Sequence, residues 1–145
     1  MQGNQDLAST LQLPKRPQKR PLRVFLVEDL PVVRNRIIES LEEIDGLEVA
    51  GFAEGEESAL SWLRSHPCDV LILDLELRQG NGLGVLRALA SSGAKPGPVK
   101  IVYSNFASAG IRQIAVQLGA SYFLDKTLDT PKLRPLLEEL SGAVG

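Results

Sequence analysis

The heptapeptide DVLILDL, residues 69–75, decides the fold that this sequence predicts. Its four central residues are consecutive aliphatics, a pattern typical of a strand buried on both faces of a parallel sheet. Asp74 follows directly. An unpaired buried charge is costly, so the carboxylate either ends the strand in solvent or has a chemical use. Because ligands of open parallel sheets bind at the carboxyl ends of strands, we expect chemistry at Asp74 and the glycine-bearing loop at 80–84.

Apolar segments of two kinds alternate around this strand. Short runs without helical spacing predict strands at 24–27, 47–52, 69–75, 99–103 and 121–124. Apolar residues three or four apart predict helices within 31–44, 56–65, 85–89, 111–118 and 131–140. Ile44 is expected on the inner face of the first helix, and Pro135 is expected to bend the last one or delay its start. The pattern predicts an α/β fold, a doubly wound five-stranded parallel sheet with five helices.

Composition limits the class of protein. The 145 residues suit one domain, and 43% apolar and 23% charged residues are typical of a globular chain. A net charge of −2 gives no nucleic-acid footprint, and no apolar run is long enough to cross a membrane. The single cysteine, Cys68, excludes an internal disulfide and fits a reducing compartment, so we expect a cytoplasmic protein. Residues 1–20 predict a flexible basic tail, and residues 21–145 a single domain.

Polar side chains are expected at the ends of four strands. Glu28 and Asp29 follow the first strand, Asp74 the third, Ser104 ends the fourth, and Lys126 comes soon after the fifth. Right-handed crossovers bring these ends to one edge of the sheet. Carboxylates packed together at pH 7 need a cation or raised pKa values, and Mg²⁺ suits an all-oxygen site. Beside such an ion, a carboxylate, a hydroxyl and an ammonium group predict phosphoryl transfer to the carboxylate.

Four stretches, VFLVEDLPVVR, DVLILDLEL, IVYSN and GASYFLDK, resemble the receiver domains of two-component response regulators. The resemblance covers residues 22–140 and implies a flavodoxin-like sheet with strand order 2-1-3-4-5. It implies that Asp74 is the phosphoacceptor and that Glu28 and Asp29 bind Mg²⁺. Asp74 itself and the backbone carbonyl of Glu76 would complete the metal ligands.

The same resemblance assigns the residues of a conformational switch. Ser104 matches the switch hydroxyl, Lys126 the lysine of the site, and Phe123 the switch aromatic. Tyr122 lies one residue too early for that role. We expect Ser104 to swing in once the phosphoryl group has arrived, and Phe123 to fill the space it leaves.

Four positions bear on how the site would behave. Many receivers carry a cis proline where this chain has Thr127, so a different loop geometry is expected. Asn105 stands where many have Ala or Gly, and its bulk could slow phosphorylation. Glu76 and Phe106 lie at positions that adjust the lifetime of the phosphoryl group in this family, or else they simply line the mouth of the crevice.

The preferred hypothesis is a signalling switch phosphorylated by a histidine kinase or a phosphotransfer protein. Such a protein is no enzyme toward external substrates and catalyses only its own phosphorylation and dephosphorylation. With no output domain visible, a homodimer or partner contact through the face at 107–140 is expected, without binding to nucleic acid or membrane.

One alternative is a degenerate receiver that binds partners without phosphorylation. Another is a Mg²⁺-dependent aspartyl phosphatase, although Glu76 stands where those enzymes carry a second Asp. The Glu-Asp pair after the first strand argues against a dinucleotide or flavin loop.

Overall fold

The computed structural model describes residues 20–93, 97–105 and 108–142. The tail expected at 1–20 lies outside these ranges except for Arg20, and so does Phe106. Five strands and five helices alternate along the described chain. They are β2 (Leu22–Val27), α1 (Pro31–Glu42), β3 (Leu47–Ala53), α2 (Glu56–Ser65), β4 (Val70–Leu73), α3 (Gly82–Ser91), β5 (Val99–Ser104), α4 (Ala109–Gln117), β6 (Tyr122–Asp125) and α5 (Thr130–Leu140).

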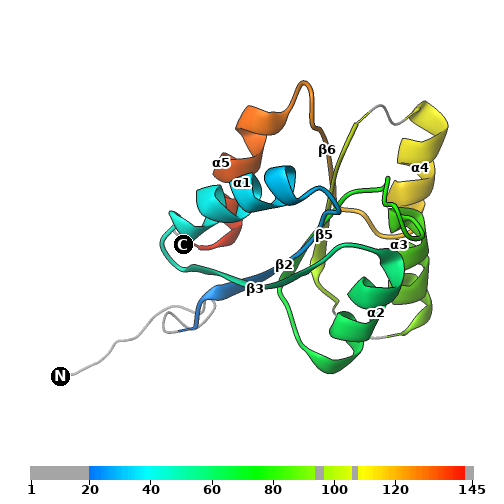
Figure 1. Cartoon of the computed structure of the whole chain (residues 1–145), viewed down its shortest axis with the longest axis horizontal. Coiled ribbons are helices and arrows are strands. Elements are labelled where there is room, and N and C mark those ends of the chain that lie inside the picture. The colour runs from blue at the N-terminus through cyan, green and yellow to red at the C-terminus, as the bar shows by residue number, and fades with distance from the viewer. Residues whose placement is uncertain (1–19, 94–96, 106–107, 143–145) are drawn as a thin grey trace.

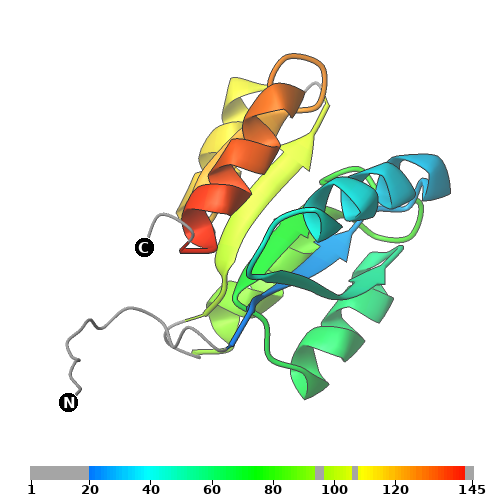
Figure 2. The ribbon, with the colours of Figure 1, turned by 90° about the vertical axis from the view of Figure 1, so that its left-hand side faces the viewer.

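The five strands form one parallel sheet in the order β3-β2-β4-β5-β6. Counted along the chain this order is 2-1-3-4-5, which confirms the predicted fold. The heptapeptide strand β4 lies at the centre of the sheet, between β2 and β5. Helices α1 and α5 cover one face, and α2, α3 and α4 cover the other (Figures 1 and 2). Because the strands are all parallel, their carboxyl ends lie at the same edge of the sheet.

Two apolar cores lie between the sheet and the helices on its two faces, because successive side chains of a strand point to opposite faces. Val24 and Leu26 of β2 join the core beneath α1 and α5. Phe25 and Val27 of the same strand join the core beneath α2, α3 and α4. All four residues of β4 are buried, as a strand covered on both sides requires. Burying each such side chain contributes about 1.5–3 kcal/mol.

Two helix predictions need correction. Helix α1 ends at Glu42, so Ile44 lies beyond it in a tight turn in which its amide bonds Leu41. Ile44 is nevertheless buried in the core beneath α1 and α5. The prediction that it faces the core is therefore correct, although the prediction that it belongs to the helix is not. For the last helix we expected either a bend at Pro135 or a late start, and the late start is wrong. Helix α5 begins at Thr130 with Pro131 in its first turn, and Pro135 lies inside it.

Cys68 lies at the edge of the sheet opposite the strand ends that carry Asp74, just before β4. It is half-buried and lines a cavity of about 550 Å³ together with residues of α2 and α3. Burial raises the pKa of the Cys68 thiol to about 11, and the nearby charge of Asp69 adds to the effect. None of the helices among the described residues has the length and hydropathy needed to cross a membrane.

Candidate functional site

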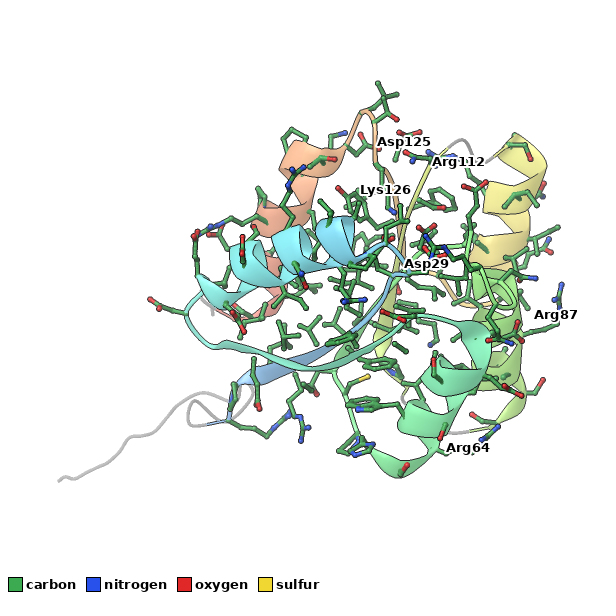
Figure 3. All side chains as sticks on the ribbon, in the orientation of Figure 1. Asp29, Arg64, Arg87, Arg112, Asp125 and Lys126 are labelled. Carbon is green, nitrogen blue, oxygen red and sulfur yellow. The ribbon has the colours of Figure 1, made fainter. Side chains whose placement is uncertain are left out.

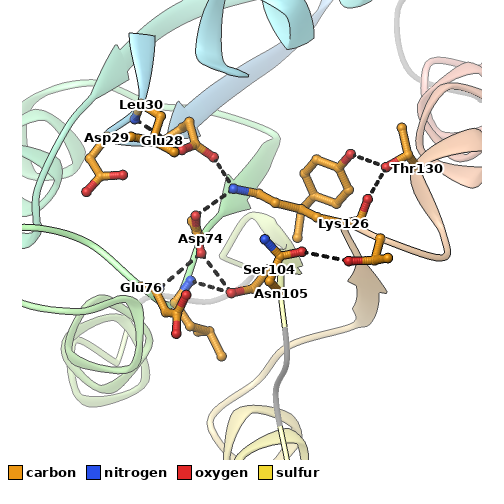
Figure 4. A network of polar contacts seen from close by, with 12 residues as sticks. Glu28, Asp29, Leu30, Asp74, Glu76, Ser104, Asn105, Lys126 and Thr130 are labelled. Atoms are coloured by element: carbon orange, nitrogen blue, oxygen red, sulfur yellow. Dashed lines mark hydrogen bonds and ion pairs between the residues drawn. The ribbon is translucent and has the colours of Figure 1, made fainter. Parts of the chain in front are cut away.

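Four strand ends bring the five predicted side chains together at one edge of the sheet. Glu28 and Asp29 follow β2, Asp74 follows β4, Ser104 ends β5, and Lys126 follows β6. Figure 3 shows Asp29 and Lys126 at the same end of the molecule, and Figure 4 shows the polar contacts among the group. The sequence prediction that these side chains share one crevice is therefore met by the fold.

Lys126 is the cation of this group. Its Nζ lies 2.6 Å from Glu28 Oε1 and 2.7 Å from Asp74 Oδ2, so one ammonium bridges two carboxylates. Glu28 is 1% exposed and Asp74 is 6% exposed, and buried charges of this kind require a partner. Burial alone would lower the pKa of Lys126, but its hydrogen bonds to Asp74 and Glu28 outweigh that effect and raise it. Burial raises the pKa of Glu28 although Lys126 opposes the shift.

Ser104 is already turned toward Asp74. Its Oγ donates to Asp74 Oδ1 at 2.7 Å and accepts from the Leu75 amide at 3.3 Å. The amide of Glu76 also donates to Asp74 Oδ1, at 3.0 Å. We expected the hydroxyl to swing in only after phosphorylation, and the described conformation differs. Without a phosphoryl oxygen, the Asp74 carboxylate is the acceptor that satisfies this buried hydroxyl.

The acidic cluster could hold a metal ion. Ligand oxygens of Glu28, Asp29 and Asp74 all lie within 4.8 Å of one another, and a donor set made only of carboxylates fits Mg²⁺. Asp29 Oδ2 accepts the Arg78 amide at 2.7 Å, which fixes the direction of this carboxylate. Both oxygens of Glu28 are engaged, one by Lys126 and the other by the Leu30 amide at 3.2 Å. Asp74 is engaged at both oxygens as well, by Lys126 at Oδ2 and by Ser104 and the Glu76 amide at Oδ1, so a metal ion would share oxygens of Glu28 and Asp74 with these donors.

The loop between β4 and α3 is fastened to the start of α2. The Glu56 amide donates to the Gln79 carbonyl at 3.0 Å, and the Glu57 amide to Gln79 Oε1 at 2.9 Å. In return, Glu56 Oε1 accepts the Asn81 amide at 3.0 Å. Gly80 adopts a φ of 73°, which a residue with a side chain rarely takes. This loop carries Glu76 and Arg78, so its attachment to α2 also supports the acidic cluster.

The two aromatic residues of β6 have different surroundings. Phe123 is half-buried against the core beneath α2, α3 and α4. The guanidinium carbon of Arg112, from α4, lies 4.4 Å from the centroid of the Phe123 ring, a cation–π distance. Tyr122 is 40% exposed. Arg112 thus covers the ring that the sequence assigns to the switch.

The departures from the usual receiver pattern form contacts of their own. The Thr127 amide, which a proline would lack, donates to Asp125 Oδ1 at 2.6 Å. The Thr127 hydroxyl donates to Asn105 Oδ1 at 3.2 Å, so the bulk of Asn105 is tied to the loop after β6. The effects expected of Asn105 and Glu76 on phosphorylation remain predictions.

Sequence reasoning missed three residues that support the site. Glu56 fastens the loop after β4, and nothing in its helical position signalled this role. Tyr103 and Thr130 share a hydrogen bond of 2.7 Å beside Lys126. A tyrosine within a strand predicted to be buried was a usable signal, because a buried phenol usually finds a hydrogen-bond partner. Its partner, 27 residues further along the chain, could not be read from spacing.

Comparison with known proteins follows from this geometry. The doubly wound sheet with acidic, hydroxyl and ammonium groups at its strand ends has the architecture of a regulatory receiver. Residues 24–138 match the family described as "Response regulator receiver domain". The chain belongs to this family, whose general function is that of a phosphorylation-activated switch in two-component systems.

Two relatives in this family illustrate its range. The protein-glutamate methylesterase/protein-glutamine glutaminase 5 of Myxococcus xanthus is 39% identical over 126 residues, 86% of this chain and 36% of that protein. Response regulator UvrY of Escherichia coli K12 is 33% identical over 106 residues, 72% of this chain and 47% of that protein. The chain therefore spans less than half the length of either relative.

Solved structures support the same fold. The response regulator domain of Thermotoga maritima CheB has a TM-score of 0.69 at 25% identity, covering 84% of this chain and 94% of that one. The signal receiver domain of a putative response regulator NarL from Mycobacterium tuberculosis has a TM-score of 0.74 at 24% identity, covering 84% and 97%. The second likeness bears on the fold alone.

Proposed function

We propose that this receiver domain accepts a phosphoryl group on Asp74 from a histidine kinase or a histidine phosphotransfer protein. The observation that carries the proposal is the convergence on one carboxylate. The Lys126 ammonium contacts Asp74 Oδ2, and the Ser104 hydroxyl contacts Oδ1. Both groups lie where they can bind oxygens of a phosphoryl group that arrives at Asp74.

In the transfer, a carboxylate oxygen of Asp74 attacks the phosphorus while the bond from phosphorus to the donor's histidine nitrogen breaks. An acyl phosphate forms, and the nitrogen leaves with the electron pair of the broken bond. Lys126 contacts the Asp74 carboxylate and then neutralises charge on the phosphoryl oxygens. Glu28, Asp29, Asp74 and the carbonyl of Glu76 would hold Mg²⁺, which supplies further positive charge to those oxygens.

The signal would leave through a change in surface contacts. Ser104 would pass from the Asp74 carboxylate to a phosphoryl oxygen, and Phe123 would respond on the α4–β6 side. The domain, proposed as residues 21–145 beyond a tail at 1–20, acts on itself and meets its donor in the cytoplasm. A second copy or a downstream partner would contact the face formed by α4, β6 and α5.

A mass measurement tests the proposal. Incubation with acetyl phosphate and Mg²⁺ should add one phosphoryl group, and Asp74→Asn should abolish this addition. Chelating the metal should slow it strongly, because the charge it supplies is lost. Asp45→Asn, at an aspartate in the turn after α1, is the matched control and should be phosphorylated like the wild type. Undiminished labelling of Asp74→Asn would overturn the assignment, and no labelling of the wild type would favour a degenerate receiver.

A further inference from the structure

Tyr103 is a buried aromatic residue that immediately precedes Ser104 in β5. Because successive residues of a strand face opposite sides, Tyr103 points into the core beneath α1 and α5. It is 6% exposed, and its hydroxyl oxygen lies 2.7 Å from Thr130 Oγ1 at the start of α5. The pair therefore connects the strand that carries Ser104 to the helix that follows Lys126.

The direction of this hydrogen-bond chain follows from the available protons. Thr130 Oγ1 donates to the backbone carbonyl of Lys126 at 2.5 Å, and a carbonyl can only accept. The single hydroxyl proton of Thr130 is thereby used. Tyr103 must then donate its own proton to Thr130, which gives the order Tyr103, Thr130, Lys126 carbonyl (Figure 4).

Tyr103 also lies beside the other end of the lysine. The Nζ atom of Lys126 is 5.8 Å from the centroid of the Tyr103 ring. The Lys126 amide donates to the Ser104 carbonyl at 3.1 Å. The lysine is thus held at its amide by β5 and at its carbonyl through Thr130, and its ammonium, which contacts Glu28 and Asp74 directly, lies near the Tyr103 ring. Holding a flexible lysine side chain in one geometry costs conformational entropy, and contacts of this kind offset that cost.

We propose that Tyr103 and Thr130 are positioning residues that place the Lys126 ammonium for phosphoryl transfer to Asp74. The inference deepens the proposed function and rests on it. Helix α5 starts at Thr130, and no side chain caps that end. The hydroxyl chain therefore fixes the start of α5 to β5, and Lys126 lies in the short loop between β6 and this anchored residue.

A purely structural role for the pair is the competing explanation, because a buried phenol needs a partner in any case. The two explanations differ in their consequences for the lysine. If Thr130 serves only as the hydrogen-bond partner of the buried Tyr103 hydroxyl, removing that hydroxyl lowers the stability of the domain and leaves the phosphorylation rate unchanged. If it positions Lys126, the rate falls while the domain stays folded, since small displacements of a catalytic group slow reactions disproportionately.

Tyr103→Phe removes only the hydroxyl, and Thr130→Val removes the next member of the chain while keeping its shape. Each variant should accept phosphate from acetyl phosphate with Mg²⁺ about five- to tenfold more slowly than wild type, the factor for one hydrogen bond and a displaced amine. The double variant should be no slower than either single one. Thr130→Ser, which retains the hydroxyl, should restore the rate. Tyr122→Phe, the matched control at the 40% exposed tyrosine, should not change it.

A second measurement does not depend on phosphorylation. The NMR signals of the Lys126 side-chain methylene next to Nζ should shift in Tyr103→Phe and Thr130→Val, and remain in place in Tyr122→Phe. Rates within twofold of wild type for both hydroxyl variants, or an unmoved lysine signal, would overturn the positioning role. If wild type takes up no phosphate, the proposed function fails, while the lysine signal still decides whether Tyr103 positions Lys126.

Discussion

Lys126 holds two buried carboxylates with one ammonium group, so the cluster of Glu28, Asp29 and Asp74 keeps an excess of negative charge. Removing one partner of a buried ion pair leaves an uncompensated charge, which is worse for the fold than removing the whole pair. The cluster could therefore accept a further cation, and without one its charge balance depends on the lysine.

Lys126→Ala should lower the free energy of unfolding by roughly 3 kcal/mol at pH 7, because Glu28 and Asp74 lose their shared partner. Since the folded pKa of Glu28 is raised, the folded state binds this proton more readily than the unfolded chain does. Stability due to Glu28 therefore rises as pH falls through its folded pKa, and the deficit of the variant should shrink in acid. Urea unfolding at pH 7 and pH 5 measures this. Lys132→Ala, at a 71% exposed lysine, should change stability by less than about 0.5 kcal/mol.

Ser104→Ala tests the switch at a single atom. Oγ of Ser104 contacts Asp74 Oδ1 and the Leu75 amide, so its loss should leave Asp74 able to accept phosphate and weaken the response. Amide NMR shifts in α4 and β6 on adding beryllofluoride, a phosphoryl mimic, should be markedly smaller than in wild type. Ser65→Ala, whose hydroxyl donates to Ser61 within α2, is the control. A full response from Ser104→Ala would exclude the hydroxyl as the switch.

Among the elements, the start of α3 is the most constrained. A Cβ on Gly82 would lie 2.4 Å from the Asp74 carbonyl oxygen and 2.9 Å from Leu75 Cα, both backbone atoms that cannot turn aside. A Cβ on Gly110, near the start of α4, would meet nothing closer than 3.9 Å. Two glycines in comparable helical positions thus have opposite roles, and the first sets how closely α3 approaches Asp74.

Gly82→Ala should therefore destabilise the domain by about 2–3 kcal/mol through overpacking, and it should weaken Mg²⁺ binding because the loop after Asp74 must shift. Gly110→Ala should stabilise by up to about 1 kcal/mol, since alanine restricts the unfolded chain. Thermal unfolding and Mg²⁺ titration followed by NMR would show both effects. Equal effects of the two substitutions would mean that α3 does not hold the loop.

The sequence predicted the strands from their apolar runs, most clearly for β4, whose four residues are all buried, whereas the edge strands β3 and β6 are only partly buried. Helix ends were less certain, as Ile44 shows, since a buried residue can belong to a turn. The strand-end rule located Asp74, Ser104 and Lys126 together. It could not give the orientation of Ser104, which depends on an acceptor 30 residues away. Contacts between distant loops, such as that of Glu56 with Asn81, leave no periodic trace in the chain.

At the scale of the whole molecule, α4, β6 and α5 form the face next to Ser104 and Phe123. Val116 is 59% exposed and Tyr122 is 40% exposed, so this face offers apolar area as well as the charge of Arg112. Arg112 covers Phe123 by its cation–π contact, and a movement of the ring would therefore move this charge.

We expect phosphorylation to favour self-association or partner binding through this face. Couplings of this kind are worth about 1–3 kcal/mol, which changes a weak interface roughly 5- to 150-fold. Sedimentation with and without beryllofluoride should show the shift, and Arg112→Glu should abolish it. Arg87→Glu, at an exposed arginine on α3, is the control (Figure 3). Unchanged association and partner affinity on activation would exclude the face as the output.

The half-buried Cys68 offers a chemical probe of local opening in the folded protein. With a thiol pKa of about 11, about one native molecule in a thousand carries the reactive thiolate at pH 8, against about one in ten at the ordinary value of 9.0. Alkylation of the native chain should therefore be at least roughly 100-fold slower than in urea, apart from steric protection. Between pH 9 and 11 the unfolded chain releases this proton first, so stability should fall as pH rises. Alkylation rates at this single thiol would then report how often the chain opens at the amino-terminal end of β4, far from the end where Asp74 lies.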